Sequence, residues 1–253
     1  SLVHNAIFAI ILILCAPLTS SFVNYPSKPL PFLSRSSKAI NMSNAGSSEG
    51  SIDVSRFMTG ERPDGTSDFV MQQTMIRVKD PERSLEFYCD VLGFKLVMFR
   101  EFPQWNFNVY FVAPVDSADI PEGDADAQWN YCMKLPGCIE VTWNYGSEKE
   151  EGMVYNTGNG DSTGTGDGSS VKGGFGHLGI TVPDVYEACE RFKKMGCTFT
   201  KTPNSGGMKG LAFIKDPDGY LVEILPQGPM ITKPVDCDGI EADGGDGYKD
   251  NSK

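Results

Sequence analysis

The amino-acid sequence predicts an α+β fold in which two βαβββ modules form curved, barrel-like mixed sheets. The first observation is an internal repeat, because "QTMIRVKDPERSLEFYCDVLGFKL" and "HLGITVPDVYEACERFKKMGCTF" align when Gln73 is set against His177. The second is that each stretch passes from the alternation of a strand to the spacing of an amphipathic helix. The third is that strand-like segments follow each helix, and a sheet of this size needs a partner to cover one face.

Each module opens with a strand and a helix that carry their own boundary signals. An aspartate, Asp80 or Asp184, stands where it would cap the helix, and Pro81 occupies the favoured first helical position. Gly93 and Gly196 follow the helices as C-caps. The apolar stripes that would face the core are Leu85, Tyr88 and Leu92 in the first helix and Val185, Cys189 and Phe192 in the second.

Alternation and turn residues predict the remaining strands. The stretch "NFNVYFVA" places Val109 and Phe111 on one face, and "GCIEVTWNYG" does the same for Glu140 and Thr142. The stretch "GLAFIKDPDGYLVEIL" reads as two strands joined by a "DPDG" turn, and Glu223 lies near the end of the second. Each module is read as the pattern β-α-β-β-β, with the strands following the helix.

Composition divides the chain into five regions. They are a cleavable targeting leader and disordered linker at 1–68, the first module at 69–147, a flexible Gly/Ser-rich connector at 148–172, the second module at 173–230 and an acidic disordered tail at 231–253.

The leader predicts import into a plastid. Its apolar run "AIFAIILILC" is too short to span a membrane but suits the core of a signal peptide. Residues 22–48 are rich in Ser and Pro and basic without any acid, which is transit-peptide composition. The combination resembles the two-part plastid leaders of algae with secondary plastids. The alternative is an internal start at Met42, which would give a cytoplasmic form.

Charge and cysteine content exclude several classes of function. A formal net charge of -11 argues against nucleic acid or an anionic membrane as a partner of the mature protein. The seven cysteines form no CxxC pair, so neither a zinc ribbon nor a redox dithiol is indicated. The thiols are expected to act as small apolar groups of the core.

The repeat predicts a metal site. It places Gln73 and His177 at equivalent points of the two first strands, and Glu140 and Glu223 in the two last strands. If the two curved sheets face each other, these side chains converge and offer N and O ligands for a divalent ion such as zinc, nickel, cobalt, manganese or magnesium. The alternative for a lone strand histidine is a hydrogen-bonded core residue, whereas a glutamate in "LVEIL" is costly to bury without a partner.

With these residues in place, the sequence resembles glyoxalase I (lactoylglutathione lyase) of the vicinal oxygen chelate superfamily. The stretches "FVMQQTMIRVKDPERSLEFYCDVLGFKL", "GFGHLGITVPDVYEAC" and "MKGLAFIKDPDGYLVEIL" carry the resemblance, which covers about 69–230. The resemblance implies the eukaryotic zinc type, with nickel or cobalt as alternative metals. It also implies a homodimer whose sites lie between subunits. The implied metal ligands are Gln73, Glu140, His177 and Glu223.

The resemblance further implies the reaction. Glutathione and methylglyoxal combine as a hemithioacetal, which the family isomerises to S-D-lactoylglutathione through a metal-stabilised ene-diolate. Glu223 takes the position of the catalytic base, and Glu140 is placed to act on the opposite face of the substrate. A carboxylate that removes the proton and returns it one carbon away is general acid–base catalysis, and the implied outcome is detoxification of methylglyoxal.

Substrate contacts are implied for the two ends of glutathione and for the methyl group. Arg77 and Asn144 match the positions that hold the γ-glutamyl end, whereas Lys201 and the Met208 backbone match those near the glycyl carboxylate. The family often has cations at Gly173 and Gly207, and Lys172 and Lys209 are the expected substitutes. The expected methyl pocket is Phe102, Val109, Phe111 and Met230, beside Arg100, where a small apolar residue is common.

Two alternatives belong to other classes of function. A metal-free binding module of the same fold would need no paired glutamates, and an isomerase could use a different thiol. An extradiol dioxygenase needs two histidines and one carboxylate around iron, and only one histidine lies outside the leader.

Overall fold

The computed structural model describes residues 54–58, 60–158, 161–163, 170–172 and 174–230. The chain divides into two compact units, Ser1–Phe69 and Val70–Lys253. The apolar run of the leader, the transit-like stretch, Met42 and the acidic tail lie outside the described residues. Plastid import therefore stays a prediction.

The described part of the first unit contains one short helix, α2 (Ser55–Met58). The Arg62 guanidinium donates hydrogen bonds to the carbonyl oxygens of Ser67 and Phe69, at 2.7 and 3.0 Å, which closes the following segment into a turn. In the described ranges of the chain, none of the helices combines the length and apolar character that crossing a membrane requires.

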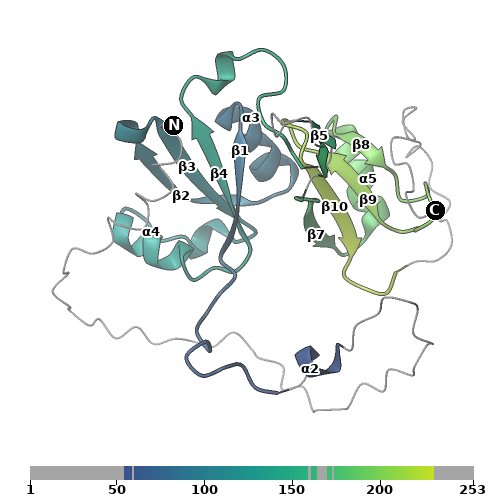
Figure 1. Cartoon of the computed structure of the whole chain (residues 1–253), viewed down its shortest axis with the longest axis horizontal. Helices are drawn as coiled ribbons and strands as arrows, with labels where there is room; N and C mark the ends of the chain where they lie inside the picture. The colour runs from purple at the N-terminus through teal and green to yellow at the C-terminus, as the bar shows by residue number, and fades with distance from the viewer. Residues whose placement is uncertain (1–53, 59, 159–160, 164–169, 173, 231–253) are drawn as a thin grey trace. The chain divides into compact units, whose positions relative to one another are not determined.

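The second unit contains two four-stranded mixed sheets, as Figure 1 shows. Their strand orders are β1-β4-β3-β2 and β7-β10-β9-β8. The strands of the first sheet are β1 (Gln73–Val78), β2 (Lys95–Phe102), β3 (Phe107–Ala113) and β4 (Cys138–Asn144). Those of the second are β7 (Leu178–Val182), β8 (Thr198–Lys201), β9 (Ala212–Lys215) and β10 (Leu221–Pro226). In each sheet the first and last strands pair in parallel and the other pairs are antiparallel, so the predicted repeat of βαβββ modules is confirmed.

The helix of each module begins and ends where the sequence predicts. Asp80 caps α3 (Pro81–Leu85) and Asp184 caps α5 (Val185–Lys194), each accepting two backbone N–H bonds in the first turn. Gly93 and Gly196 end the helices with φ of 80° and 79°, a left-handed conformation that favours glycine.

The first module contains a π-helical turn that the repeat did not predict. Thirteen residues lead from Asp80 to Gly93 (93 − 80), against twelve from Asp184 to Gly196 (196 − 184). The segment Glu86–Val91 absorbs the extra residue as a π turn, and both helices still end at a glycine.

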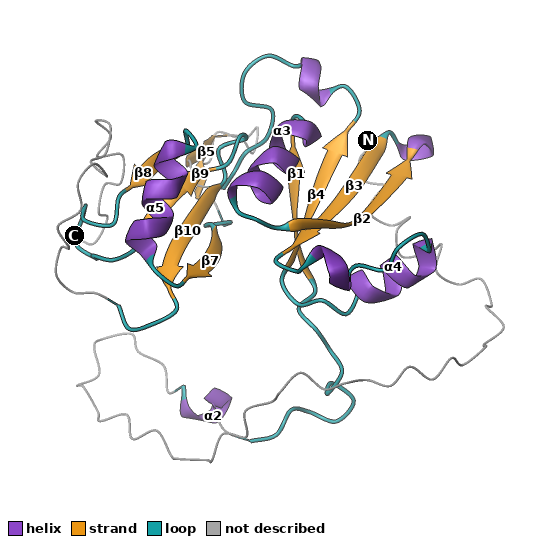
Figure 2. Cartoon of the chain, turned by 180° about the vertical axis from the view of Figure 1, so that it is seen from behind, coloured by secondary structure: helices purple, strands orange, loops and turns teal. Residues whose placement is uncertain are grey.

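Further short elements lie between the strands. They are the 3-10 turns η2 (Pro103–Trp105), η3 (Ser117–Asp119) and η4 (Ser147–Lys149), the helix α4 (Ala125–Cys132) and the hairpin strands β5 (Asp161–Thr163) and β6 (Ser170–Lys172). Figure 2 shows α4 beside β2 and α5 against β10. The sequence predicted neither α4 nor the hairpin.

Two apolar clusters hold the second unit together. The first draws on both modules, with Val78 and Tyr88 from one and Val222 and Ile224 from the other, and all four side chains are fully buried. The second cluster lies between the other face of the first sheet and α4, whose Cys132 contributes to it. The expectation that the cysteines act as small core groups holds for Cys132, Cys138 and Cys189, which are buried free thiols.

The "DPDG" turn between β9 and β10 ties the second module to the edge strand of the first. Asp218 accepts from the Lys79 backbone N–H at 2.9 Å, and Asp216 accepts from the Tyr88 hydroxyl at 2.9 Å. The Tyr220 hydroxyl donates to the Arg77 carbonyl oxygen at 3.0 Å. The bonds to the Lys79 N–H and the Arg77 carbonyl oxygen satisfy backbone groups along the edge of β1 that no neighbouring strand pairs with.

Candidate active site

The first pair of predicted ligands meets at the junction of β1 and β4. Gln73 Nε2 donates a hydrogen bond to one carboxylate oxygen of Glu140. The Thr142 hydroxyl donates to the other carboxylate oxygen at 3.3 Å. Alternation along β4 explains why Thr142 and Glu140 share a face, and the parallel register explains why Gln73 reaches them.

Burial shapes the electrostatics of Glu140. Removal from water raises the pKa of this carboxyl, while the hydrogen bonds from Thr142 and Gln73 and the charge of Arg77 oppose the rise. A buried carboxylate with few donors is a group that a cation would stabilise.

The second pair meets at the junction of β7 and β10. The His177 Nε2 lies 3.0 Å from a carboxylate oxygen of Glu223. The imidazole side chain is 41% exposed and the carboxylate side chain 15% exposed. The Phe213 ring contacts the imidazole edge-on, with centroids 5.2 Å apart. One side of the imidazole is thus packed and the other remains open to a ligand.

The two pairs are built in the same way. Gln73 precedes by two residues the partner of Glu140 in the β1–β4 register, which is Met75. His177 precedes by two residues the partner of Glu223 in the β7–β10 register, which is Gly179. Each sheet therefore presents one carboxylate and one further N or O donor at an equivalent point.

The structure brings the four predicted ligands together as two pairs. Within the described ranges, no group of three or more His, Cys, Asp or Glu side chains is placed to hold a metal ion. The donor types nevertheless fit a divalent ion with N and O ligands, because each pair supplies a carboxylate together with an amide or an imidazole. Each pair supplies two of the four ligands that the sequence predicts.

The predicted γ-glutamyl contacts lie on the same face as the first pair. Arg77 pairs with Thr142 in the β1–β4 register, and Asn144 lies two residues further along β4. Asn144 Nδ2 donates to the Tyr155 hydroxyl at 3.0 Å. The Arg77 guanidinium and the Asn144 amide thus lie beyond Glu140, towards the ends of β1 and β4, on the same face of the sheet.

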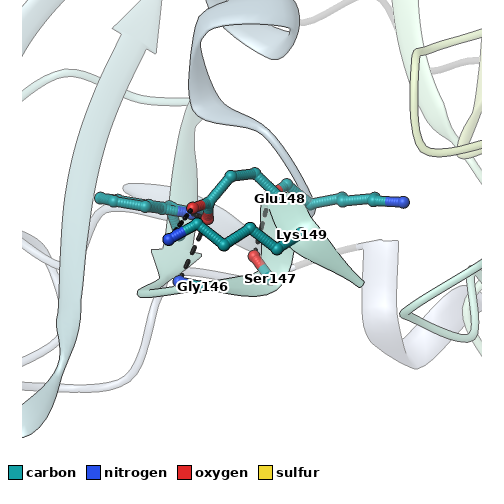
Figure 3. A network of polar contacts seen from close by, with 6 residues as sticks. Gly146, Ser147, Glu148 and Lys149 are labelled. Atoms are coloured by element: carbon teal, nitrogen blue, oxygen red, sulfur yellow. Dashed lines mark hydrogen bonds and ion pairs between the residues drawn. The ribbon is translucent and has the colours of Figure 1, made fainter. Parts of the chain in front are cut away.

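A network of polar contacts anchors the turn that follows β4, as Figure 3 shows. Glu148 accepts from the Trp143 indole and from the Gly146 N–H, both at 3.1 Å. The Ser147 hydroxyl donates to the Lys79 carbonyl oxygen at 2.8 Å. The turn therefore fixes the end of β4, where Asn144 lies, against the end of β1.

The predicted glycyl-carboxylate contacts lie at the end of β8, where Lys201 is the last residue, and in the loop that follows, which contains Met208. Lys201 Nζ donates to the Leu211 carbonyl oxygen at 2.7 Å and to the Thr202 carbonyl oxygen at 3.2 Å. Burial, with a smaller contribution from the neighbouring Lys209, lowers the pKa of Lys201 to about 8. This lysine keeps one of its three N–H donors for a ligand.

The structure describes the side chain of only one of the two lysines, Lys209 and Lys172, that were expected to replace the missing cations. Lys209 Nζ donates to the carbonyl oxygens of Asn204 and Gly206, at 2.6 and 2.7 Å, so it closes the loop. Met208 is 65% exposed at the tip of the same loop. The Lys172 side chain and Gly173 lie outside the described residues.

Three of the four residues of the predicted methyl pocket lie together. Val109 and Phe111 are buried in the cluster under α4 and Phe102 packs against it, while Met230 is exposed and lies outside that cluster. The Arg100 guanidinium donates to the Ala125 carbonyl oxygen at 2.6 Å, in the first turn of α4. Arg100 thus attaches α4 to the sheet face that carries Glu140.

Sequence reasoning missed Tyr155 as a member of the site. It lies in the region predicted as a flexible connector, where no periodicity or repeat partner marks a residue. Thr142 was placed on the correct face, but its hydrogen bond to Glu140 was not predicted.

The chain is similar in sequence to a known protein family and to named relatives. Residues 70–224 match the family model described as the Glyoxalase/Bleomycin resistance protein/Dioxygenase superfamily. A "Lactoylglutathione lyase" of Pseudomonas putida is 44% identical over 173 residues, which are 68% of this chain and 94% of that protein. A "Lactoylglutathione lyase" of Schizosaccharomyces pombe is 38% identical over 161 residues, which are 64% of this chain and 46% of that protein.

Among solved structures, the chain is similar to glyoxalase I from Zea mays. The two are 27% identical, with a TM-score of 0.42 over 63% of this chain and 45% of the maize chain. The family model spans more than half of the 253 residues and includes all four paired side chains. The chain belongs to the glyoxalase/bleomycin resistance protein/dioxygenase superfamily, as the sequence predicted.

Proposed function

We propose that the protein is a lactoylglutathione lyase, which isomerises the hemithioacetal of methylglyoxal and glutathione to S-D-lactoylglutathione. The observation that carries the proposal is the pair of matched half-sites, Gln73 with Glu140 and His177 with Glu223. The 44% identity to a relative named lactoylglutathione lyase, over 94% of its length, supports the same reaction.

Glu223 is proposed as the base. Its carboxylate is only slightly exposed and lies 3.0 Å from His177, so it is shielded from water and held in place. It would take the proton from C1 of the hemithioacetal and return it to C2, a transfer that needs a carboxylate within hydrogen-bond reach of both carbons. Glu140 lies in the equivalent place of the other sheet and would face the opposite side of the substrate.

The four paired side chains would hold a divalent metal ion, for which zinc is proposed and nickel or cobalt are the alternatives. Bound there, the ion would act as a Lewis acid on the two vicinal oxygens of the substrate. Two carboxylates balance the charge of one divalent ion, which suits a site from which one carboxylate must leave to act as a base.

Arg77 and Asn144 are proposed to bind the γ-glutamyl end of glutathione, and Lys201 with the Met208 backbone the glycyl carboxylate. Both regions carry a cation whose neighbours are ordered by hydrogen bonds. Glycine at 173 and 207 leaves fewer cations than the family often has, so we expect a KM toward the high end of such enzymes.

A homodimer is proposed to complete the site. Each chain presents two half-sites with equivalent geometry, and a two-fold axis would bring the first half-site of one protomer to the second half-site of its partner.

The proposal is tested by an activity assay with metal removal. The protein is stripped with a chelator, returned to zinc, nickel or cobalt separately, and mixed with methylglyoxal and glutathione while the thioester absorbance is followed. We expect no activity in the stripped protein, recovery with a divalent ion, and a loss of about a thousandfold or more for Glu223→Gln. An active stripped protein, or a fully active Glu223→Gln variant, would contradict the proposal.

A further inference from the structure

Tyr155 lies outside both predicted modules, yet its hydroxyl contacts the candidate site. It accepts a hydrogen bond from Asn144 Nδ2 at 3.0 Å, and both side chains are half-buried. Asn144 stands at the end of β4, on the face that carries Glu140 and Thr142. The Tyr155 hydroxyl therefore lies next to the polar side chains on this face of β4.

The segment around Tyr155 is fixed on both sides. Before it, the Gly152 carbonyl oxygen accepts from Lys79 Nζ at 3.3 Å. After it, Gly158 has a φ of +86° and packs so closely that an added Cβ would overlap the Phe175 carbonyl oxygen. These contacts place the backbone of the segment against both modules, close to Asn144 on one side and just ahead of His177 on the other.

The hydrogen bond holds the Asn144 amide in place at the end of β4. A tyrosine hydroxyl can pair with either side of an amide, and here it accepts from Nδ2. With Nδ2 directed to Tyr155, the carbonyl oxygen Oδ1 is turned away, and among the described residues none donates a hydrogen bond to it. Oδ1 would then accept from the ammonium of an α-amino acid, while Arg77 on the neighbouring strand binds its carboxylate.

We propose that Tyr155 is a positioning residue that orients Asn144 for the γ-glutamyl end of glutathione. The proposal rests on the proposed function and deepens it, because it assigns a role in substrate recognition to the connector between the modules. Tyr155 acts through Asn144 and takes no part in the proton transfer.

The test is the Tyr155→Phe variant, which keeps the ring and removes only the hydroxyl. We expect KM for the hemithioacetal to rise about five- to tenfold with kcat unchanged, since one hydrogen bond remote from the reacting carbons is lost. The matched control is Tyr145→Phe, whose hydroxyl donates to Asn108 at 2.7 Å instead, and it should leave KM unchanged. A wild-type KM in Tyr155→Phe would overturn the proposal.

Two further measurements separate positioning from a structural role. The affinity for S-methylglutathione, measured by calorimetry, should fall in Tyr155→Phe by the same factor as KM rises. In an Asn144→Ala background Tyr155→Phe should have no additional effect, because the two residues act as one unit. A loss that persists in that background would contradict the proposal. An inactive wild type that still binds S-methylglutathione would instead overturn the proposed function and leave Tyr155 testable by binding.

Discussion

Glu140, Asp216 and Lys201 show how the surroundings of single ionisable residues shift their pKa values. Burial raises the pKa of Glu140, and it raises the pKa of Asp216 to about 6. Burial lowers the pKa of Lys201 to about 8. In each of these three shifts the uncharged form is favoured because water is removed. Hydrogen bonds partly offset this effect at Glu140 and Asp216, and the negative charge of Glu223 opposes it at Lys201. These shifts make two residue-scale predictions.

The raised pKa of Asp216 predicts that the difference in stability between the parent and Asp216→Asn depends on pH. The pKa of Asp216 is raised in the folded state. Its contribution to the stability of the fold is therefore fully present below its pKa in the unfolded chain, about 3.8, and is lost as pH rises through about 6. We subtract the free energy of unfolding of the parent from that of Asp216→Asn at each pH. This difference should be about 2 kcal/mol larger near pH 7.5 than near pH 4. Urea unfolding at both pH values measures this, with the exposed Asp64→Asn as control. An equal difference at both pH values would contradict the assignment.

The lowered pKa of Lys201 predicts that the affinity for S-methylglutathione depends on pH. The ammonium is lost as pH rises through about 8, so the affinity for S-methylglutathione should fall above that pH. In Lys201→Arg the charge persists, because a guanidinium stays protonated, and the affinity should remain level. Calorimetric titration with S-methylglutathione between about pH 7 and pH 9 distinguishes the parent from Lys201→Arg. The same dependence of affinity on pH in both proteins would show that Lys201 does not bind the ligand.

At the scale of elements, the sequence predicted those features that local chemistry specifies. Alternation, aspartate caps and terminal glycines were sufficient for the strands and helices of both modules. The repeat also placed the candidate ligands at equivalent points of the two sheets, and the strand registers show these equivalent positions. The π turn at Glu86–Val91, helix α4 and the contact of Tyr155 were not predicted. They depend on tertiary packing, which leaves no period in the sequence.

The connector gives an element-scale prediction at Gly158. Gly158→Ala would force a Cβ against the Phe175 carbonyl oxygen, in addition to the cost of a positive φ. Gly137 has a φ of +72° and open space where a Cβ would be added, so Gly137→Ala isolates the cost of the backbone conformation. We expect Gly158→Ala to lose about 1–3 kcal/mol more than Gly137→Ala in urea unfolding. Equal losses would show that the connector does not pack against Phe175.

The "DPDG" turn gives a second prediction at this scale. Tyr220→Phe removes the hydroxyl that satisfies the Arg77 carbonyl oxygen at the edge of β1. Tyr220 is only 6% exposed, so water replaces that hydroxyl poorly and the variant should be about 1–2 kcal/mol less stable. The free energy of unfolding in urea checks this, and an unchanged value would mean that the edge of β1 is solvated.

In the whole molecule, the two half-sites are proposed to combine into one catalytic site. The half-sites come from the two modules, share one register and lie in different sheets. The described part of a single chain gathers no set of three His, Cys, Asp or Glu ligands. A two-fold dimer would resolve this, because it pairs each half-site with the complementary half of the partner.

Complementation between two inactive variants tests whether the catalytic site is shared between protomers. One chain carries Gln73→Ala with Glu140→Ala, the other carries His177→Ala with Glu223→Ala, and the two are expressed together. Each alone should be inactive, whereas random mixed dimers hold one intact site and should recover about a quarter of the wild-type activity. A mixture as inactive as its components, with mixed dimers present, would contradict a site shared between protomers.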